Sequence, residues 1–245
     1  MIRYPFNGSK KISVNGSRVH IFLNFVTQYM AIMLDRILEL RKEYSREKLD
    51  EQVTSDNPIQ QFRVWFEEAL KAKLIEPNAM MLATVNEQNR PSMRIVLLRD
   101  ILDDGIVFYT NYLSRKGNEI EINPYGSATF FWPELERQVR IEGVLRKIDE
   151  QVSDSYFAKR PRGSQIGAWS SPQSKTIQSR NELEENELHY TSLFEGKDVP
   201  RPTHWGGYVL HPDYMEFWQG RENRLHDRIC YTLSEGNWDR TRLAP

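Results

Sequence analysis

The chain has 245 residues, of which 39% are hydrophobic and 27% are charged, and its formal net charge is −1. This balance is typical of a folded protein with a sizeable core, and it argues against a general nucleic-acid or membrane-surface binder, which needs an excess of basic residues. The single cysteine, Cys230, excludes an internal disulfide and a cysteine-based zinc site, and is consistent with a reducing, cytoplasmic compartment.

Residues 1–40 are a candidate N-terminal extension. Basic residues precede an apolar run over 19–34, which His20, Asn24 and Gln28 interrupt. The run is too short and too polar to predict a membrane span, and no small-residue cleavage pattern follows it. Apolar residues near helical spacing over 32–48 leave two alternatives, a poorly ordered extension or a helical arm joined to the next segment.

A helix is predicted after this extension. The sequence Asp56-Asn-Pro58 is a helix-start signal, with the proline near the first turn. Pro77 marks the point by which the helix has ended. The apolar residues at helical steps between these signals are Ile59, Phe62, Phe66, Ala69 and Leu70.

Beyond Pro77 the pattern changes to short segments rich in Val, Ile, Phe and Thr, separated by turn-forming residues. Strands are predicted over 79–85, 92–98, 106–110, 127–132 and 137–147. In the last of these, Val139 and Ile141 share one face, while Gln138 and Arg140 share the other. Strands at this spacing predict an antiparallel sheet that closes into a barrel, rather than a βαβ repeat.

The second half of the chain is predicted to add helices and further strands to this sheet. Helical patterns cover 149–159 and 178–194, and a compact Gly/Ser-rich segment, 163–174, lies between them. Strands are predicted over 207–210, 214–218, 228–233 and 238–243. The predicted fold is therefore one domain over 41–245, mainly β with inserted helices, preceded by the extension over 1–40.

Three basic segments, two of which also contain aromatic residues, suit a flat, anionic ligand. The densest is 218–228, which contains an aromatic ring, three guanidiniums, an imidazole and a carboxylate. Guanidiniums hold phosphate and ring oxygens by bidentate hydrogen bonds, and an aromatic side chain covers an apolar ring edge. The other two segments are 114–117 and 156–164, and the alternative for each is a charged surface segment.

Signatures of other enzyme classes do not occur in the sequence. It contains no G-x-G-x-x-G or G-x-x-x-x-G-K-[ST] phosphate loop, no G-x-S-x-G elbow and no H-E-x-x-H motif. The five histidines have no metal-ligand spacing, so no metal is expected. A bound phosphate must therefore be held by side chains and helix starts.

Two candidate anion-binding positions can be inferred from the local sequence alone. Ser114 is placed to cap a helix after a strand, so that free backbone N–H groups and the cations Arg115 and Lys116 face an anion; the alternative is a capped surface helix. Arg94 lies within an apolar strand, where an unpaired guanidinium is costly. We therefore expect a ligand or a carboxylate beside it.

Ten short motifs occur in a characteristic order along the chain. They are Arg94-Ile-Val-Leu-Leu98, Phe108-Tyr-Thr-Asn111, Ser114-Arg-Lys116, Glu136-Arg-Gln-Val139, Arg160-Pro-Arg162, Ser164-Gln-Ile-Gly-Ala168, Trp205-Gly-Gly207, Glu216-Phe-Trp-Gln-Gly220, Asn223-Arg-Leu-His-Asp-Arg228 and Arg242-Leu-Ala-Pro245. Together, over about 41–245, they resemble the pyridoxamine/pyridoxine 5'-phosphate oxidase family, FMN enzymes that make pyridoxal 5'-phosphate. The resemblance implies an FMN-binding split β-barrel that forms a homodimer, with the cofactor at the subunit interface.

The resemblance also implies the reaction and the residues that hold FMN. Pyridoxamine 5'-phosphate and pyridoxine 5'-phosphate would pass a hydride to FMN, and dioxygen would reoxidise the flavin to give hydrogen peroxide. The positions that match the family's FMN contacts are Arg94, Ile95, Val96, Leu97, Tyr109, Thr110, Arg115, Lys116, Gln138, Gln173, Ser174, Trp218 and Arg228.

A second set of positions matches the family's substrate contacts. The phosphate set is Tyr156, Arg160 and Ser164, completed by Arg99, where the family usually has lysine. Tyr156 and Arg160 are four apart, so they would share one face of a helix. The remaining positions are Arg224, Leu225 and His226 over the pyridine ring, and Arg41 and Tyr44 from the N-terminal side.

Arg224 and His226 are the implied catalytic residues, because they would orient the substrate C4' carbon toward flavin N5. His226 could also act as a general base, although hydride transfer mainly needs alignment. Asp227 beside it is expected to be an ion-pair partner. The rival interpretations are a flavin reductase that uses a nicotinamide and a non-catalytic flavin or pyridoxal-phosphate binder.

Overall fold

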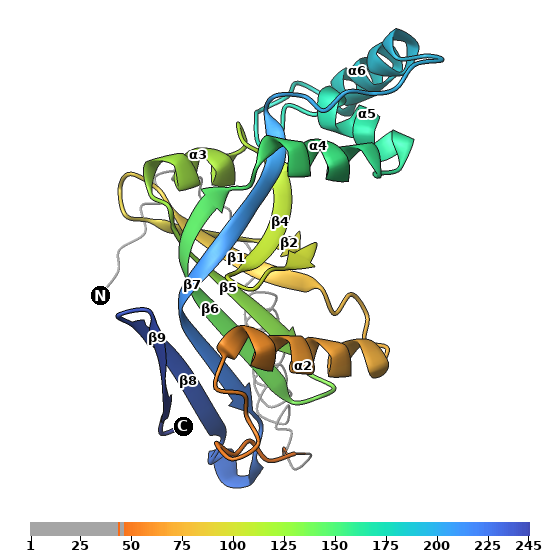
Figure 1. The fold of residues 1–245 in the computed structure, drawn as a ribbon. Coiled ribbons are helices and arrows are strands. Elements are labelled where there is room, and N and C mark those ends of the chain that lie inside the picture. Colours follow the sequence, from red (N-terminus) through yellow and green to blue (C-terminus); the bar gives the residue numbers. More distant parts are fainter. Residues whose placement is uncertain (1–43, 45–46) are drawn as a thin grey trace, which may run out of the picture. The chain divides into compact units, whose positions relative to one another are not determined.

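The computed structural model of this protein describes Tyr44 and residues 47–245, which form one compact unit (Figure 1). The predicted extension over 1–40 lies outside the described residues, as do Arg41 and nearly all of the helical pattern over 32–48. The domain boundary near residue 40 therefore stays a prediction. Among the described helices, none has the length and apolar character needed to cross a membrane.

Nine strands of the described residues form one antiparallel sheet, with the order β2-β1-β5-β6-β7-β4-β3 and with β8 and β9 added beside β7. The strands are β1 Ala79–Val85, β2 Pro91–Leu97, β3 Asp100–Ile101, β4 Ile106–Asn111, β5 Tyr125–Trp132, β6 Arg137–Lys147, β7 Trp205–Gln219, β8 Asp227–Ser234 and β9 Asn237–Arg242. The ends of this order, β2 and β3, are consecutive in the chain, and the backbone N–H of Arg99 between them donates to the carbonyl of Val107. The sheet therefore curls into the predicted antiparallel split barrel.

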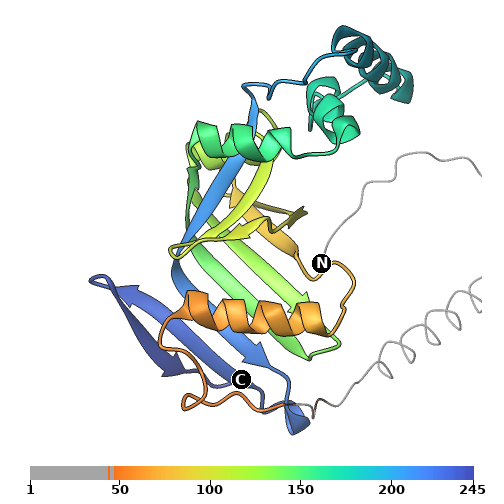
Figure 2. The same ribbon diagram turned by 45° about the vertical axis from the view of Figure 1, so that its right-hand side comes forward.

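The helices α2 Pro58–Lys71, α3 Arg115–Ile122, α4 Glu150–Ala158, α5 Arg162–Ser170 and α6 Arg180–Leu193, with the 3₁₀ turn η1 Glu222–Arg224, are inserted between the strands. Figure 2 shows α2 lying across the curled sheet. Its predicted start is confirmed, because Asn57 Oδ1 accepts hydrogen bonds from the N–H groups of Ile59 (2.8 Å) and Gln60 (3.1 Å). Its buried face packs into the main core through Ile59, Phe62, Trp65 and Ala69.

Strand β6 shows why the barrel has a core. Its residues alternate between buried and half-buried, with Val139 and Ile141 fully buried. The predicted assignment of Gln138 and Arg140 to the opposite face is confirmed. This alternation lets one face of the sheet bury its apolar side chains while the other remains available for polar contacts.

Two predicted strands, 207–210 and 214–218, are one continuous strand, β7, so their separation was wrong. Pro212 lacks a backbone N–H and is typical of a strand end, which explains the wrong prediction. The strand continues because the register with β6 shifts between Glu142 and Gly143, as in a β-bulge. A Cβ atom on Gly143 would lie only 2.0 Å from the carbonyl oxygen of His211, so this close approach requires glycine.

The Gly/Ser-rich segment predicted over 163–174 begins with a helix, α5, which the sequence pattern missed. Glycine and serine lower helix propensity, so the local signal is weak. Tertiary packing supplies what the sequence lacks: Ile166 joins Phe157, Val199 and Trp205 in a second, smaller core under α4 and α5. Strand β3, only two residues long, was also too short to predict.

Candidate active site

A cavity of about 330 Å³ opens at one end of the barrel, where β2, β4, α3 and α4 meet; we call it the basic cavity. It is lined by Arg94, Ile95, Val96, Leu97, Arg99, Tyr109, Thr110, Asn111, Lys116, Tyr156, Arg160, Gln173 and Trp205. These residues come from segments that are far apart in the sequence. Among them, Asn111 and Trp205 were not predicted as site residues, although both lie inside motifs that carried the family resemblance.

The start of α3 has the predicted cap and places Lys116 in the cavity. Ser114 Oγ accepts a hydrogen bond from the Gly117 N–H (3.3 Å), and Lys116 Nζ lies 2.9 Å from both Thr110 Oγ1 and Gln173 Oε1. Burial, followed by the nearby Arg94 guanidinium, lowers the pKa of Lys116 to about 8. Within the described residues no carboxylate contacts this partly buried ammonium, which is therefore suited to an anionic ligand.

Arg94 has the carboxylate partner that the sequence led us to expect. Its Nη2 donates to Glu119 Oε2 (3.1 Å) and Ser92 Oγ (2.5 Å), while Nη1 donates to Thr84 Oγ1 (2.6 Å) and the Leu82 carbonyl (3.2 Å). Protein atoms therefore accept hydrogen bonds from both Nη groups. Arg94 contributes its charge to the cavity while its guanidinium is held firmly in place.

Arg115 and Ser174 lie beside the basic cavity and do not line it. Both line a neighbouring groove of about 460 Å³. Arg115 Nε donates to Glu119 Oε1 (2.8 Å), so Glu119 connects this groove to Arg94. The first turn of α3 thus lies between the basic cavity and this groove.

Arg160 supplies an unsatisfied cation at the other side of the cavity. Its guanidinium carbon lies 4.4 Å from the ring centroid of Trp205, and its Nη1 is buried without a hydrogen-bond partner in the described part of the chain. Burial, and then Arg99, lowers the pKa of Arg160 below its ordinary value, against an opposing effect of Tyr156. Arg160 lines the cavity, and a guanidinium N–H without a protein partner is suited to a phosphate oxygen.

Three aromatic rings build the wall beside Arg160. The rings of Tyr109 and Tyr156 stack with centroids 3.9 Å apart at 5°, and Trp205 lies parallel to Tyr109 at 5.3 Å. Burial, and then Tyr156, raises the pKa of Tyr109 to about 12, so its hydroxyl stays protonated at neutral pH. The wall is rigid and apolar, with hydroxyl groups at its edge.

The predicted helical pairing of Tyr156 and Arg160 was wrong. Helix α4 ends at Ala158, and Arg160 follows in a turn whose N–H donates to the Phe157 carbonyl. Pro161 prevents the helix from continuing. Both side chains reach the cavity nevertheless, whereas Ser164 is exposed in the first turn of α5 and is not among the residues that line it.

The remaining predicted residues gather around β7 and β8, and we call Tyr44, Gln138, Trp218, His226 and Arg228 the C-terminal cluster. The Trp218 ring centroid lies 4.6 Å from that of His226, and Tyr44 packs edge-on at 5.7 Å from the first and 5.8 Å from the second. Arg224 and Leu225 are exposed beside them, with Arg224 in a left-handed backbone conformation (φ 61°).

The protonation state of His226 follows from its surroundings. Its Nδ1 accepts a hydrogen bond from the Arg221 N–H (3.1 Å), so the neutral ring carries its proton on Nε2. Burial, and then the Arg224 guanidinium, lowers the pKa of His226 below its ordinary value. At neutral pH the side chain therefore presents an Nε2–H donor. Asp227 is an ion-pair partner as expected, with Arg242 at 2.7 Å.

Gln138, Trp218 and Arg228 form one row across three strands, because Gln138 pairs with Trp218 and Trp218 pairs with Arg228. Arg228 is held by both oxygens of the buried Glu216, at 2.9 and 3.0 Å, and by the Ala244 carbonyl at 2.8 Å. Glu216 and the Ala244 carbonyl thus fix the position of the Arg228 guanidinium.

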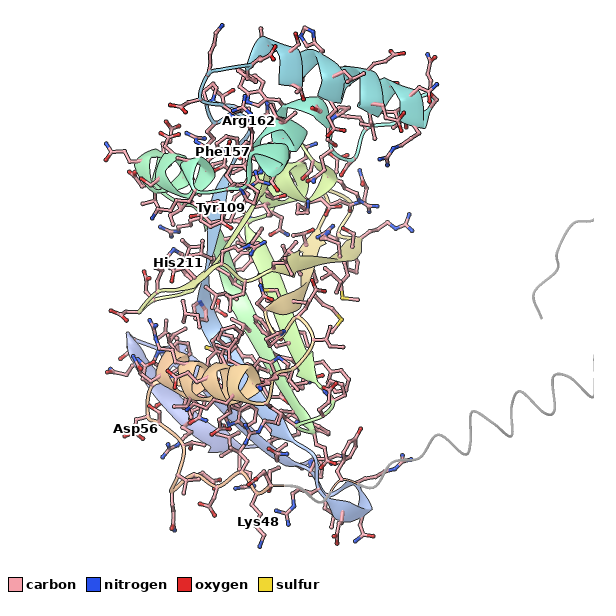
Figure 3. All side chains as sticks on the ribbon, turned by 90° about the vertical axis from the view of Figure 1, so that its right-hand side faces the viewer. Lys48, Asp56, Tyr109, Phe157, Arg162 and His211 are labelled. Carbon is pink, nitrogen blue, oxygen red and sulfur yellow. The ribbon has the colours of Figure 1, made fainter. Side chains whose placement is uncertain are left out.

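The basic cavity and the C-terminal cluster lie at opposite ends of β7. Trp205 begins the strand and Trp218 is near its end, and thirteen residues at about 3.3 Å each separate them by roughly 40 Å along the strand. Figure 3 shows Tyr109 and Phe157 toward one end of the unit, His211 about midway, and Lys48 toward the other end. One chain therefore does not bring the two groups together.

Comparison with known proteins places this arrangement in a family. Residues 66–186 match the family model described as "Pyridoxamine 5'-phosphate oxidase", and residues 205–245 match "Pyridoxine 5'-phosphate oxidase C-terminal dimerisation region". The pyridoxine/pyridoxamine 5'-phosphate oxidase of Rubrobacter xylanophilus is 55% identical over 206 residues, covering 84% of this chain and 95% of the relative. That of a Cyanothece species is 50% identical over 209 residues, covering 85% and 98%.

The chain belongs to the pyridoxine/pyridoxamine 5'-phosphate oxidase family. Membership confirms the predicted enzyme class, an oxidoreductase that makes pyridoxal 5'-phosphate, and points to a flavin cofactor. The match over 205–245, which covers β7 to β9, supports the predicted homodimer because that model describes a dimerisation region.

Solved structures confirm the split-barrel fold of this family. PhzG from Burkholderia lata, in complex with tetrahydrophenazine-1-carboxylic acid, superposes with a TM-score of 0.77 at 30% identity, covering 82% of this chain and 100% of that one. A pyridoxamine 5'-phosphate oxidase-related, FMN binding protein from Nostoc punctiforme shares the fold, with a TM-score of 0.62 at 18% identity and coverage of 81% and 100%.

Proposed function

We propose that this chain oxidises pyridoxamine 5'-phosphate and pyridoxine 5'-phosphate to pyridoxal 5'-phosphate, with FMN as cofactor and dioxygen as the final acceptor. The observation that carries the proposal is the buried Arg160 Nη1 without a partner, in a cavity that also contains Lys116. Cofactor and substrate are both phosphate esters, so the reaction needs two anion positions. The names of the relatives that are 50–55% identical support the same substrates.

The first anion position is the start of α3. Backbone N–H groups of the first turn, Lys116 Nζ and the charges of Arg94 and Arg115 converge there. We assign this position to the FMN phosphate, with Thr110 and Gln173 as further contacts. Ser174 lies in the adjoining groove with Arg115.

The second anion position is the Arg160 side of the cavity. Arg160 has an unused N–H group there, Arg99 adds a second guanidinium, and Tyr156 adds a hydroxyl. We assign this position to the substrate phosphate. The exposed Arg99 keeps the positive charge of the family's usual lysine, but it presents a planar fork in place of a single ammonium.

A second copy of the chain completes the site. The row of Gln138, Trp218 and Arg228 belongs to a sheet face that also exposes Phe131 (49%) and Ile95 (61%). Apolar side chains exposed on a sheet face favour burial against a partner. In the homodimer we infer, the C-terminal cluster of one subunit approaches the basic cavity of its partner. This adds the rings of Trp218 and His226 to the aromatic wall that the cavity already has.

The chain's own residues then bind, orient and shield the reactants. Trp218 packs against the flavin edge, and the fixed Arg228 guanidinium favours negative charge near it. The Nε2–H of His226, with Arg224, orients the pyridine ring so that C4' faces the flavin. Bound FMN would supply the hydride acceptor for C4', and its reoxidation by dioxygen would release hydrogen peroxide. The alcohol yields the aldehyde directly; the amine also consumes water and releases ammonia.

A simple assay tests this function. Purified protein loaded with FMN should form hydrogen peroxide and pyridoxal 5'-phosphate from either phosphorylated vitamer, with oxygen consumed in equal amount. The unphosphorylated vitamers serve as the matched control, because they lack the group that Arg160 is proposed to hold. Protein that binds FMN but forms no peroxide would be a flavin binder, and oxidation of a nicotinamide in place of the vitamers would indicate a flavin reductase. The cytoplasmic location stays a prediction from the single cysteine.

A further inference from the structure

Glu119 on α3 connects the cations around the proposed FMN phosphate position. It is only 4% exposed. Its Oε2 accepts hydrogen bonds from Thr84 Oγ1 (2.5 Å), Ser92 Oγ (2.6 Å) and Arg94 Nη2 (3.1 Å), and its Oε1 accepts one from Arg115 Nε (2.8 Å). One carboxylate therefore joins a guanidinium from β2 to a guanidinium from α3.

We propose that Glu119 is a positioning residue for FMN binding: it fixes Arg94 and Arg115 beside the phosphate and sustains the charge of Lys116. This inference rests on the proposed function, since it assigns a role to a residue that neither lines the basic cavity nor belongs to the predicted contacts. Glu119 lines only the adjoining groove.

The hydrogen bond to Arg115 explains the need for such a residue. The Arg115 side chain is 62% exposed, so without an anchor its many rotamers would all be accessible. The bond from Nε holds the side chain at its base and leaves both Nη groups available for a ligand. Fixing the side chain before the ligand arrives lowers the entropy lost on binding.

Charge compensation is the second reason. Arg94, Arg115 and Lys116 place three positive charges close together, and like charges disfavour one another in a partly buried site. Burial alone would raise the pKa of Glu119, but hydrogen bonds from Ser92, Thr84, Arg115 and Arg94 hold it at about 2. Its carboxylate is therefore ionised across the physiological range. The group keeps a net charge of +2, which matches a phosphomonoester dianion.

The protonation of Lys116 offers a measurement that distinguishes the proposed role of Glu119 from a merely structural one. Burial and Arg94 lower its pKa, whereas Glu119 raises it. The charged and titratable groups around Lys116 are Arg94 from β2, Arg115 and Glu119 from α3, Arg99 and Tyr109 around the cavity, and Tyr156 and Arg160 from the α4 end. Among these groups, the acidic residue that raises the pKa of Lys116 is Glu119. Removing its charge should therefore make Lys116 lose its proton at a lower pH.

The experiment measures binding of FMN, and separately of inorganic phosphate, to the flavin-free protein from pH 6 to pH 10. Glu119→Gln should weaken FMN binding about tenfold at pH 7 and move the alkaline midpoint of binding to lower pH. Glu119→Asp keeps the charge but is one methylene shorter, so affinity should fall while the midpoint stays in place. Glu121→Gln is the matched control, because Glu121 is on the same helix, is 71% exposed and pairs with Lys147.

Unchanged or tighter binding by Glu119→Gln, or an unmoved midpoint, would overturn the proposal. Should Glu119→Gln fail to fold, a double-mutant cycle decides: the loss caused by Glu119→Asp should largely vanish in an Arg115→Ala background, and additive losses would contradict the role. Wild-type protein that binds phosphate but not FMN would refute the proposed cofactor while the phosphate series still tests Glu119. Wild-type protein that binds neither would overturn both.

Discussion

The basic cavity and the C-terminal cluster differ in how each depends on tertiary structure. The cavity assembles side chains from β2, β4, α3 and α4 and from the segment around Gln173. Its cations are partly buried, and Arg160 Nη1 has no hydrogen-bond partner among the described residues. The cluster takes three of its five residues from the short stretch 218–228, and Arg224 and Leu225 beside it are exposed. A flat ring needs both anion binding and ring contacts. Because these two half-sites, the basic cavity and the C-terminal cluster, lie roughly 40 Å apart along one strand, we propose that a second subunit joins them.

The largest effect is expected from a substitution that prevents the two half-sites from meeting. Phe131→Glu places a charge on the sheet face that carries Gln138 and Trp218, where burial against a second copy would be costly. We expect a monomer by light scattering and a loss of oxidase activity of at least about a hundredfold. Leu188→Glu on α6, where the leucine is 72% exposed, is the control that should change neither. A dimeric, active Phe131→Glu protein would refute the assigned face.

Removing the unsatisfied cation separates the two anion positions within the cavity. Arg160→Ala should raise KM for the phosphorylated vitamers about a hundredfold, as expected for loss of a desolvated ion pair, while FMN stays bound. Steady-state kinetics and the flavin absorbance of the purified variant measure the two effects. Arg162→Ala is a matched control, since Arg162 donates to the carbonyls of Phe194 and Lys197. Equal loss of FMN would mean that the two positions have been assigned in reverse.

Arg228→Ala tests the contribution of the C-terminal cluster to the cofactor. We expect flavin retention after dialysis to fall, with Kd for FMN raised about tenfold or more, because a fixed cation near the flavin is lost. The variant should also be less stable, since the buried Glu216 loses its bidentate partner. Arg240→Ala on β9 controls for the loss of a half-buried guanidinium outside the cluster, since Arg240 pairs with the exposed Asp56 and donates to the Thr54 carbonyl. Full flavin occupancy in Arg228→Ala would argue against this assignment.

The smallest expected effect is the pH dependence of FMN binding. Because the pKa of Lys116 is lowered to about 8, its ammonium is lost as pH rises through that value, and affinity should fall several-fold above it. A bound phosphate dianion favours the ammonium, so binding near pH 8 should take up protons. Calorimetry in buffers of different ionisation enthalpy measures this uptake. Lys116→Gln should bind FMN more weakly at pH 7 and show no such uptake, and a pH-independent wild-type affinity would contradict the assignment.

Local patterns predicted much of the fold because they act over a few residues. The alternation in β6, the cap at Asn57 and the cap at Ser114 each rest on neighbouring side chains, and each is present. The failures had tertiary causes. The register shift at Gly143 lets β7 continue through Pro212. The second, smaller core, which contains Trp205 and Ile166, stabilises the glycine-containing helix α5.

For the candidate site, motifs and periodicity were enough to predict the family, the barrel and most of the residue types. The pairing of the cations depended on the folded chain: Arg94 pairs with Glu119, Arg228 pairs with Glu216, and Arg160 Nη1 has no hydrogen-bond partner among the described residues. The tertiary structure also placed Trp205 beneath Arg160 and separated the two half-sites. The reason is physical, because the partner, burial and pKa of a charge depend on segments that meet only after the sheet has curled.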